Sequence, residues 1–181
     1  MKLGLALARL VIGGLMFGHG TQKLFGWFGG HGRAGTAGFF ESLGLRPGDR
    51  SAVAAGASEA AGGALLALGL ATPLAGALIS GPMITAIRTV HLPNGPWVSD
   101  GGYEYNAVLL AAVFAIVDVG PGDLSLDRAL GTERSGPGWA ILQLAAAAAG
   151  SAAIIKAAQG DPDSPSTPDS PQAGDPATQG A

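Results

Sequence analysis

The sequence predicts an all-α integral membrane protein, built as a helical bundle of four core spans. Charged residues make up 13% of the 181 residues, whereas a soluble domain carries roughly a quarter. The hydrophobic fraction is 48% and the mean hydropathy is +0.35. The chain also holds 31 glycines, and small residues let helices in a bilayer approach closely. These three features together indicate an integral membrane protein.

Five apolar segments divide the chain. They run over residues 3–28, 51–71, 74–92, 104–119 and 139–155. A helix of about 20 residues crosses the hydrocarbon core, so the first four segments are predicted as the core spans. The fifth is short and rich in alanine. We expect it to form either an additional C-terminal span or a helix at the membrane interface.

The organisation predicted from these segments has three parts. A transmembrane bundle covers residues 1–130, and the additional transmembrane or interfacial helix covers residues 131–158. Residues 159–181 are rich in Pro, Ser and Asp. Such a composition buries too little apolar surface to offset the entropy lost on ordering. This tail is therefore predicted to be disordered.

Two connections carry structural signals. Thr72 and Pro73 join the second and third segments by a tight turn, which predicts an antiparallel hairpin. Between the first and second segments, residues 33–50 are too apolar for a plain loop. They predict a short interfacial or re-entrant helix that ends at Gly44.

Small residues four positions apart predict which helix faces pack together. The pairs are Gly14 and Gly18 on the first span, and Gly76 with Ser80 and Ala77 with Gly81 on the third. Pro82 has no N–H, so we expect it to kink the third span and to free a backbone carbonyl one turn earlier.

The chain has no cysteine. It therefore cannot form a disulfide, use a thiolate nucleophile or bind a cysteine-ligated cluster. Any redox role must use a bound cofactor, a metal or a partner. The formal net charge of -3, without a basic cluster, argues against nucleic acid as a partner.

Polar residues inside the spans are the candidates for function, because each ionisable group at mid-bilayer costs at least about 2.5 kcal/mol. In an up-down bundle, the end of span one, the start of two, the end of three and the start of four face the same side. Eight such residues lie in that half of the membrane: His19, Gln22, Lys23, Glu59, Arg88, His91, Glu104 and Asn106. Arg9 belongs to the other half.

The residue types suggest two sets of roles. Glu59, His19, His91 and Glu104 are the candidate catalytic groups, because carboxylates and imidazoles take up and release protons. The candidate substrate-binding groups are Lys23, Arg88, Gln22 and Asn106. His19, Gln22 and Lys23 share one helix stripe, as do Arg88 and His91. No HxxH or ExxH spacing supports a metal site, and none is predicted.

Several of these residues also fit structural roles. Lys23 lies near a helix end and can extend its ammonium group to lipid phosphates. His19 on its own fits a packing role, and Glu104 fits a helix-start residue. Glu59 is the hardest to explain structurally, because a carboxylate well inside a span has no inexpensive structural role. Phe25, Trp27 and Phe28 fit an interfacial aromatic belt.

The blocks LARLVIGGLMFGHGTQKLFGWFGGHG, GFFESLGL, EAAGGALLALGLATPLAG, TVHLPNGPW, GGYEYN and GPGDLSLDRAL follow one another over residues 3–130. In this order they resemble the DoxX family of small bacterial membrane proteins. The eight candidate residues all match family motifs. The resemblance implies no established set of catalytic residues.

The resemblance implies an oxidoreductase component of the plasma membrane. The family takes its name from subunits of a thiosulfate:quinone oxidoreductase, and some relatives associate with a superoxide dismutase and a sulfurtransferase in oxidative stress. A membrane redox component with a quinone acceptor is therefore the favoured function, while the cofactor itself stays undetermined. Two alternatives stay open. One is a non-catalytic scaffold that recruits soluble redox enzymes. The other is a small-anion binding or transport module, in which a homo-oligomer would supply the missing wall of the site. Lysines and arginines are nearly balanced between the two sides, so orientation also stays open.

Overall fold

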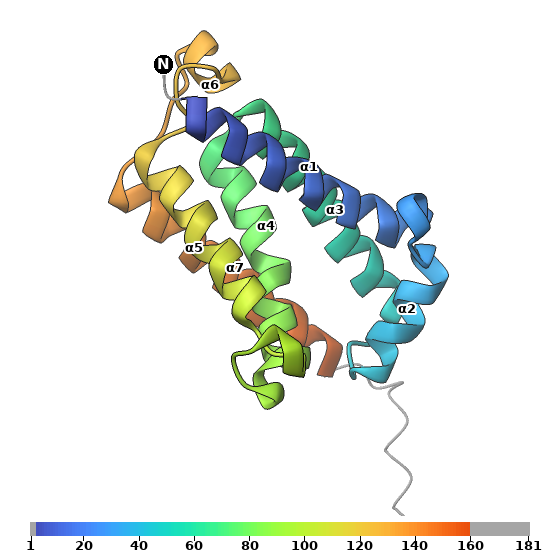
Figure 1. Ribbon diagram of the computed structural model, residues 1–181. Helices are drawn as coiled ribbons and strands as arrows, with labels where there is room; N and C mark the ends of the chain where they lie inside the picture. Colours follow the sequence, from blue (N-terminus) through green and yellow to red (C-terminus); the bar gives the residue numbers. More distant parts are fainter. Residues whose placement is uncertain (1–2, 160–181) are drawn as a thin grey trace, which may run out of the picture.

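The computed structural model describes residues 3–159, so all but one residue of the predicted tail lies outside the described residues. Seven α-helices form in this range: α1 (Leu3–Phe25), α2 (Gly32–Ser42), α3 (Gly48–Leu68), α4 (Thr72–Ala86), α5 (Glu104–Val119), α6 (Leu126–Leu130) and α7 (Pro137–Gln159). Short helical turns cover Trp27–Gly29, Ile87–His91, Leu92–Asn94 and Val98–Asp100. The predicted all-α bundle is confirmed (Figure 1).

Within the described residues, four helical stretches are long and apolar enough to cross a membrane: Leu3–Phe25, Gly48–Leu68, Thr72–Asn94 and Pro137–Ala158. The fifth apolar segment thus forms a helix of spanning length, and this helix packs against α4 and α5. The fourth segment forms α5, whose 16 residues extend only about 24 Å. It nevertheless contributes Leu109, Val113 and Ile116 to the buried core.

α1 and α3 pack with their backbones almost in contact. A methyl group added at Gly13 would lie 2.5 Å from the carbonyl oxygen of Gly63, and one at Gly20 would lie 2.5 Å from that of Gly56. The contact therefore repeats every seven residues on both helices. The predicted pair of Gly14 and Gly18 is wrong, because open space surrounds both positions.

The small pair on α4 does face another helix, as predicted. A methyl group at Gly76 would lie 3.1 Å from Gln143 Oε1 on α7, and Ser80 Oγ lies 3.4 Å from the same oxygen. Gly62 packs against Leu78 of α4, while the adjacent Gly63 packs against α1. These two neighbouring glycines allow α3 to lie close to two helices at once.

Pro82 interrupts the hydrogen bonding of α4, as expected. The carbonyl oxygen of Leu78, four residues earlier, has no proline N–H to accept from, and Ser58 Oγ of α3 donates to it over 2.7 Å. Beyond Ala86 the helix continues as a π-helical turn over Ile87–His91. Such turns are often found at functional sites.

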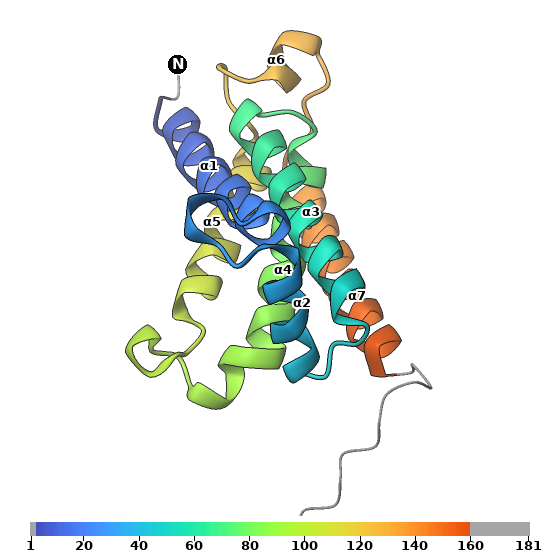
Figure 2. The ribbon, with the colours of Figure 1, turned by 90° about the vertical axis from the view of Figure 1, so that its right-hand side faces the viewer.

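A polar cap closes one end of the bundle, where α6 lies beside the α3–α4 turn (Figures 1 and 2). The buried Asp127 carboxylate accepts hydrogen bonds from the N–H groups of Ala71 and Thr72 and from the Thr72 and Thr132 hydroxyls. The Asp127 N–H donates to Gly69 O. Asp127 therefore satisfies the free N–H groups at the start of α4.

Arg9 reaches the same cap from α1. Its side chain is 2% exposed, and Nη2 donates to the carbonyl oxygen of Leu124. Asp127 attracts its guanidinium electrostatically. Arg9 therefore ties the first helix to the connection between α5 and α7, in the half of the bundle opposite to the candidate site.

The helices are close together at this capped end and diverge toward the opposite end, where α2 lies (Figure 1). α2 packs against α3 and α1, which confirms a short helix between the first two spans. It ends at Ser42, and Gly44 follows with φ +75°, a conformation that glycine adopts readily.

The glycine contact predicts a sharp difference between neighbouring positions. Gly20→Ala should lower the free energy of unfolding by about 1–3 kcal/mol, because its methyl group meets backbone that cannot move aside. Gly18→Ala is the matched control and should change stability little. Unfolding of the purified variants in mixed micelles measures both, and equal losses would contradict the packing described.

The cap predicts a pH dependence of stability. Burial alone would raise the pKa of Asp127, but the hydrogen bonds from Thr72, Ala71 and Thr132 outweigh it and hold the pKa below its usual range. Because the native pKa is depressed, the stabilisation is complete above the unfolded value of about 3.9 and is lost as the pH falls through the native value.

Thermal unfolding in detergent between about pH 6 and pH 3 tests this prediction. The wild-type melting temperature should fall at the acid end, and Asp127→Asn should lower it at pH 6 and flatten the acid dependence. An unchanged acid dependence in Asp127→Asn would assign the effect to other carboxylates.

Candidate functional site

An ion pair between α1 and α3 is the centre of the candidate site. Lys23 Nζ lies 2.5 Å from Glu59 Oε2, and the two side chains are 25% and 3% exposed. Gly20 is one turn before Lys23, and its close contact with Gly56 and Ala60 brings the two helices together at this level. The backbone packing therefore places the ammonium group against the carboxylate.

A cavity of about 540 Å³ adjoins this pair. Its walls come from α1, α2, α3, α4, α5 and α7 and are mostly apolar, with Phe39, Phe40 and Leu45 on the side of α2. The polar groups include Lys23 and Glu59. A largely apolar pocket with a few convergent polar groups is the usual form of a small-molecule site.

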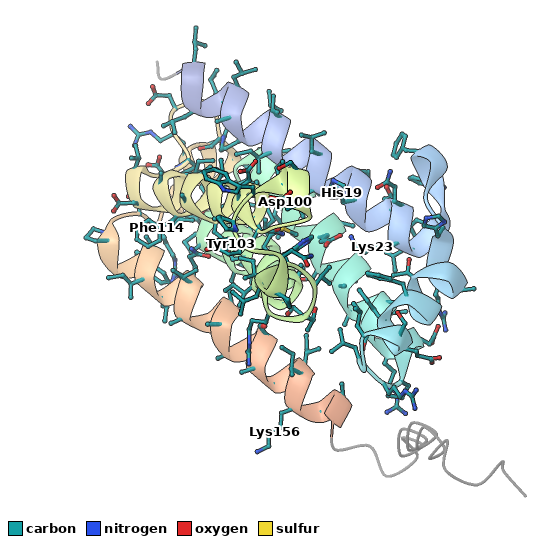
Figure 3. All side chains as sticks on the ribbon, turned by 60° about the horizontal axis from the view of Figure 1, so that its bottom comes forward. His19, Lys23, Asp100, Tyr103, Phe114 and Lys156 are labelled. Atoms are coloured by element: carbon teal, nitrogen blue, oxygen red, sulfur yellow. The ribbon has the colours of Figure 1, made fainter. Side chains whose placement is uncertain are left out.

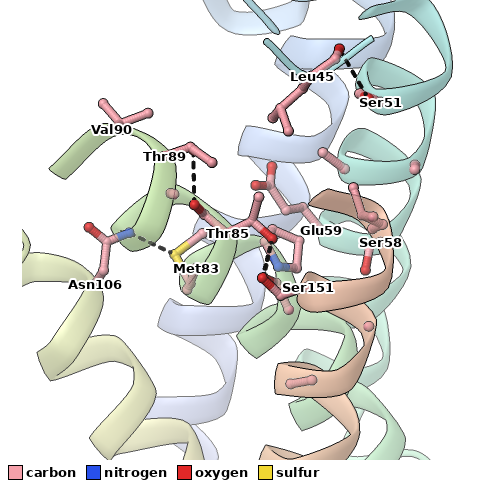
Figure 4. Close-up of a pocket in the computed structure, with 18 of the residues that line it drawn as sticks. Leu45, Ser51, Ser58, Glu59, Met83, Thr85, Thr89, Val90, Asn106 and Ser151 are labelled. Carbon is pink, nitrogen blue, oxygen red and sulfur yellow. Dashed lines mark hydrogen bonds between the residues drawn. The ribbon is translucent and has the colours of Figure 1, made fainter. Parts of the chain in front are cut away.

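Hydroxyl groups of α4 and α7 contact one another in the wall of the cavity (Figure 4). Thr85 Oγ1 lies 2.9 Å from Ser151 Oγ and 3.0 Å from the carbonyl oxygen of Gly81. Thr89 Oγ1 donates to Thr85 O over 2.9 Å. Asn106 is buried on α5, and its Nδ2 lies 3.3 Å from Met83 Sδ.

His91 lines the cavity from the π-helical turn. Its Nδ1 lies 2.7 Å from the carbonyl oxygen of Gly101. A carbonyl oxygen only accepts, so Nδ1 carries the hydrogen in this contact. In the neutral imidazole, Nε2 is then left as the proton acceptor.

Five of the eight residues predicted from the sequence line this cavity: His19, Lys23, Glu59, His91 and Asn106. His19 and Lys23 follow one another along α1 (Figure 3). The sequence argument, which places the ends of four segments on one side, therefore brings most of the set to one place. Their chemical roles stay predictions.

The other three predicted residues are not among the cavity-lining residues of the described range 3–159. Gln22 Nε2 donates to the Phe28 carbonyl over 3.3 Å and so holds the turn after α1. Arg88 is exposed, and Glu104 begins α5 with its N–H bonded to Pro96 O. The roles predicted for these three residues in catalysis and binding stay predictions.

The chain is similar to known proteins. The DoxX family model matches residues 4–92. A protein of Bacillus subtilis (strain 168), named "Putative oxidoreductase CatD", is 35% identical over 126 residues, which cover 70% of this chain and 86% of that protein. The chain belongs to the DoxX family. No solved structure matches it.

The DoxX match covers α1 to α4 and therefore Lys23, Glu59 and His91. Asn106 and Ser151 lie beyond the matched residues, on α5 and α7. The cavity of this DoxX protein is thus completed by two helices outside the matched segment.

Sequence reasoning missed the hydroxyl residues of the site, among them Ser58, Thr85 and Ser151. Serine and threonine occur in membrane helices at little cost because they bond to their own backbone, so nothing marks them in the sequence. Pro82 offered a partial signal, since the carbonyl it frees needs a donor. Asp127 was also missed, because it lies in a connection between spans.

Within residues 3–159, no group of three His, Asp or Glu side chains is placed to bind a metal ion. The aromatic residues Phe25, Trp27 and Phe28 are exposed and pack on one another. They lie outside the cavity wall, which fits the belt that the sequence suggested.

The two partners of the ion pair predict an unequal response to substitution. Lys23→Met leaves the buried Glu59 carboxylate without its partner and should lower the free energy of unfolding by on the order of 3 kcal/mol. Glu59→Gln should cost less, because the partly exposed Lys23 can turn toward the membrane surface. Arg33→Met, which breaks an exposed pair with Asp49, should change stability little, because solvent screens such a pair.

A double-mutant cycle in mixed micelles measures these differences. The double variant Lys23→Met with Glu59→Gln should recover part of the loss seen in Lys23→Met alone. Strictly additive losses would show that the two groups do not interact.

Proposed function

We propose that this protein is a membrane oxidoreductase component of the plasma membrane, in which the cavity binds a quinone. The observation that carries this proposal is the Lys23–Glu59 pair, which adjoins an otherwise largely apolar cavity of about 540 Å³. The volume fits a drug-sized ring with a short chain. The name of the Bacillus subtilis relative supports the reaction class.

The proposed reaction transfers two electrons to the quinone. A sulfur-containing anion such as thiosulfate supplies them: two thiosulfate ions join through a new S–S bond and release two electrons. The quinone takes up these two electrons and two protons and becomes a quinol. Since the chain has no cysteine, the electrons pass directly between bound molecules or through a partner protein.

The cavity residues suit this reaction in type. The Lys23 ammonium stabilises negative charge that develops on a quinone oxygen. The Glu59 carboxylate and the Nε2 atom of His91 accept protons from water and pass them to the reduced ring. Asn106, Thr85 and Ser151 offer hydrogen bonds that orient the ring. A superoxide dismutase and a sulfurtransferase are the proposed partners in oxidative stress, by family resemblance.

Thiosulfate-dependent reduction of a quinone by the purified protein in nanodiscs tests the proposal. Glu59→Gln should lower kcat by about 100-fold or more, as loss of a proton-transfer group does. Arg33→Gln on the exposed side of α2 is the control and should retain activity. Each variant is first checked for wild-type elution and melting.

Absence of turnover in the wild type, both alone and with an added dismutase and sulfurtransferase, would reject the redox function. Recruitment of those enzymes to the vesicles that survives in Glu59→Gln would then favour the scaffold. A flux of small anions lost in Glu59→Gln would favour transport.

A further inference from the structure

Two smaller pockets adjoin the main cavity, and they differ in chemistry. One, of about 200 Å³, lies between α1 and α5 and is lined by Ile12, Leu15, Met16, Tyr105, Val108, Leu109 and Ala112. The other, of about 230 Å³, lies between the start of α3 and the end of α7 and includes Arg46 and Arg50. Each shares lining residues with the main cavity.

The α1–α5 groove is continuous with the site. Met16 and Tyr105 line both the groove and the main cavity. Every other lining residue of the groove is aliphatic, and Leu15 and Val108 are 55% and 68% exposed on its outer side. The groove therefore joins the cavity to the lipid-facing surface of the bundle.

The direction of the groove fits an amphipathic ligand. Lys23 lies near the end of α1, and Ile12 lies eleven residues earlier, near the middle of this helix. This spacing corresponds to about 16 Å along the axis, about half of the hydrocarbon thickness. A molecule with its head at Lys23 would thus have its tail pointing toward the centre of the bilayer.

The pocket between α3 and α7 does not fit a tail equally well. Arg46 and Arg50 are among its lining residues, and guanidinium groups are stable at the level of the lipid headgroups rather than in the hydrocarbon core. Of the two side pockets, the α1–α5 groove is therefore the one suited to hydrocarbon.

We propose that the α1–α5 groove holds the hydrocarbon tail of the quinone whose ring occupies the cavity, and that the quinone enters from the bilayer between these two helices. This inference rests on the proposed function for the identity of the head. It assigns the occupant of the groove, and it names long-chain quinones as the substrates of the site.

The test uses a benzoquinone with a ten-carbon tail that ends in a diazirine. The full-length protein in phosphatidylcholine nanodiscs is irradiated with this probe, and mass spectrometry locates the label. We expect label on residues 12–16 and 105–112, and competition by the same quinone without the diazirine. Label concentrated around Arg46 and Ile154 would overturn the proposal.

Adjacent alanines on α5 provide a matched pair of variants. Ala112 lines the groove, whereas Ala111 is exposed and does not. Ala112→Phe should lower the labelling several-fold, and Ala111→Phe should leave it unchanged. Val108→Trp, at a 68% exposed position, is a second variant that fills the groove with less risk to folding. Equal labelling in all of these variants would overturn the proposal.

A phosphatidylcholine with a diazirine in its acyl chain distinguishes the ordinary lipid. If it labels the groove and the tailed quinone does not compete, the groove holds bulk lipid and the proposal fails. Labelling as expected without quinone turnover rejects only the redox function. Turnover with the label elsewhere rejects only the groove.

Discussion

Backbone contact between α1 and α3 is the constraint on which the rest of the structure depends. In a bilayer, apolar side chains gain little by leaving lipid for another helix, so close packing and polar contacts must hold the helices together. Gly13 and Gly20 lie against Gly63 and Gly56. This contact fixes the rotation of both helices and places Lys23 opposite Glu59. The buried Glu59 carboxylate is stable there because the glycine-packed face of α1 also carries its partner, Lys23.

The cavity follows from an asymmetry between the two ends of the bundle. At one end, Asp127 and Arg9 bind the α3–α4 turn and α1 to the connection that precedes α7. At the other end, α4 passes through Pro82 into a π-helical turn, and α2 packs against α3 and α1. Helices fixed at one end and spread at the other enclose a space, while Ile79 and Val113 remain in the buried core.

The absence of cysteine shapes the proposed chemistry. A chain without thiols cannot store electrons itself, so the site must bring donor and acceptor together or meet a partner. The DoxX match ends at residue 92, so the groove residues of α5 and the wall residues of α7 belong to the part of the chain outside that match.

The sequence by itself determined the class of fold and the helix order, and it predicted that the polar residues lie at one end of the bundle. These follow from hydropathy and from the alternation of spans, which depend on local composition and chain direction alone. It also identified Lys23, Glu59 and His91 as candidates, because ionisable groups are rare in lipid. The free carbonyl one turn before Pro82 was also predictable, because it depends only on the missing N–H of that one residue.

Only the tertiary structure decided which of these residues meet. It selected Gly13 and Gly20 over the Gly14–Gly18 pair, because the face that a helix buries depends on its rotation against a neighbour and not on its own spacing. It left Arg88 exposed. It also brought Ser151 of α7 to Thr85 of α4, 66 residues away in the chain. Cavities and grooves arise from the angles between helices, and those angles are set by contacts between residues far apart in sequence.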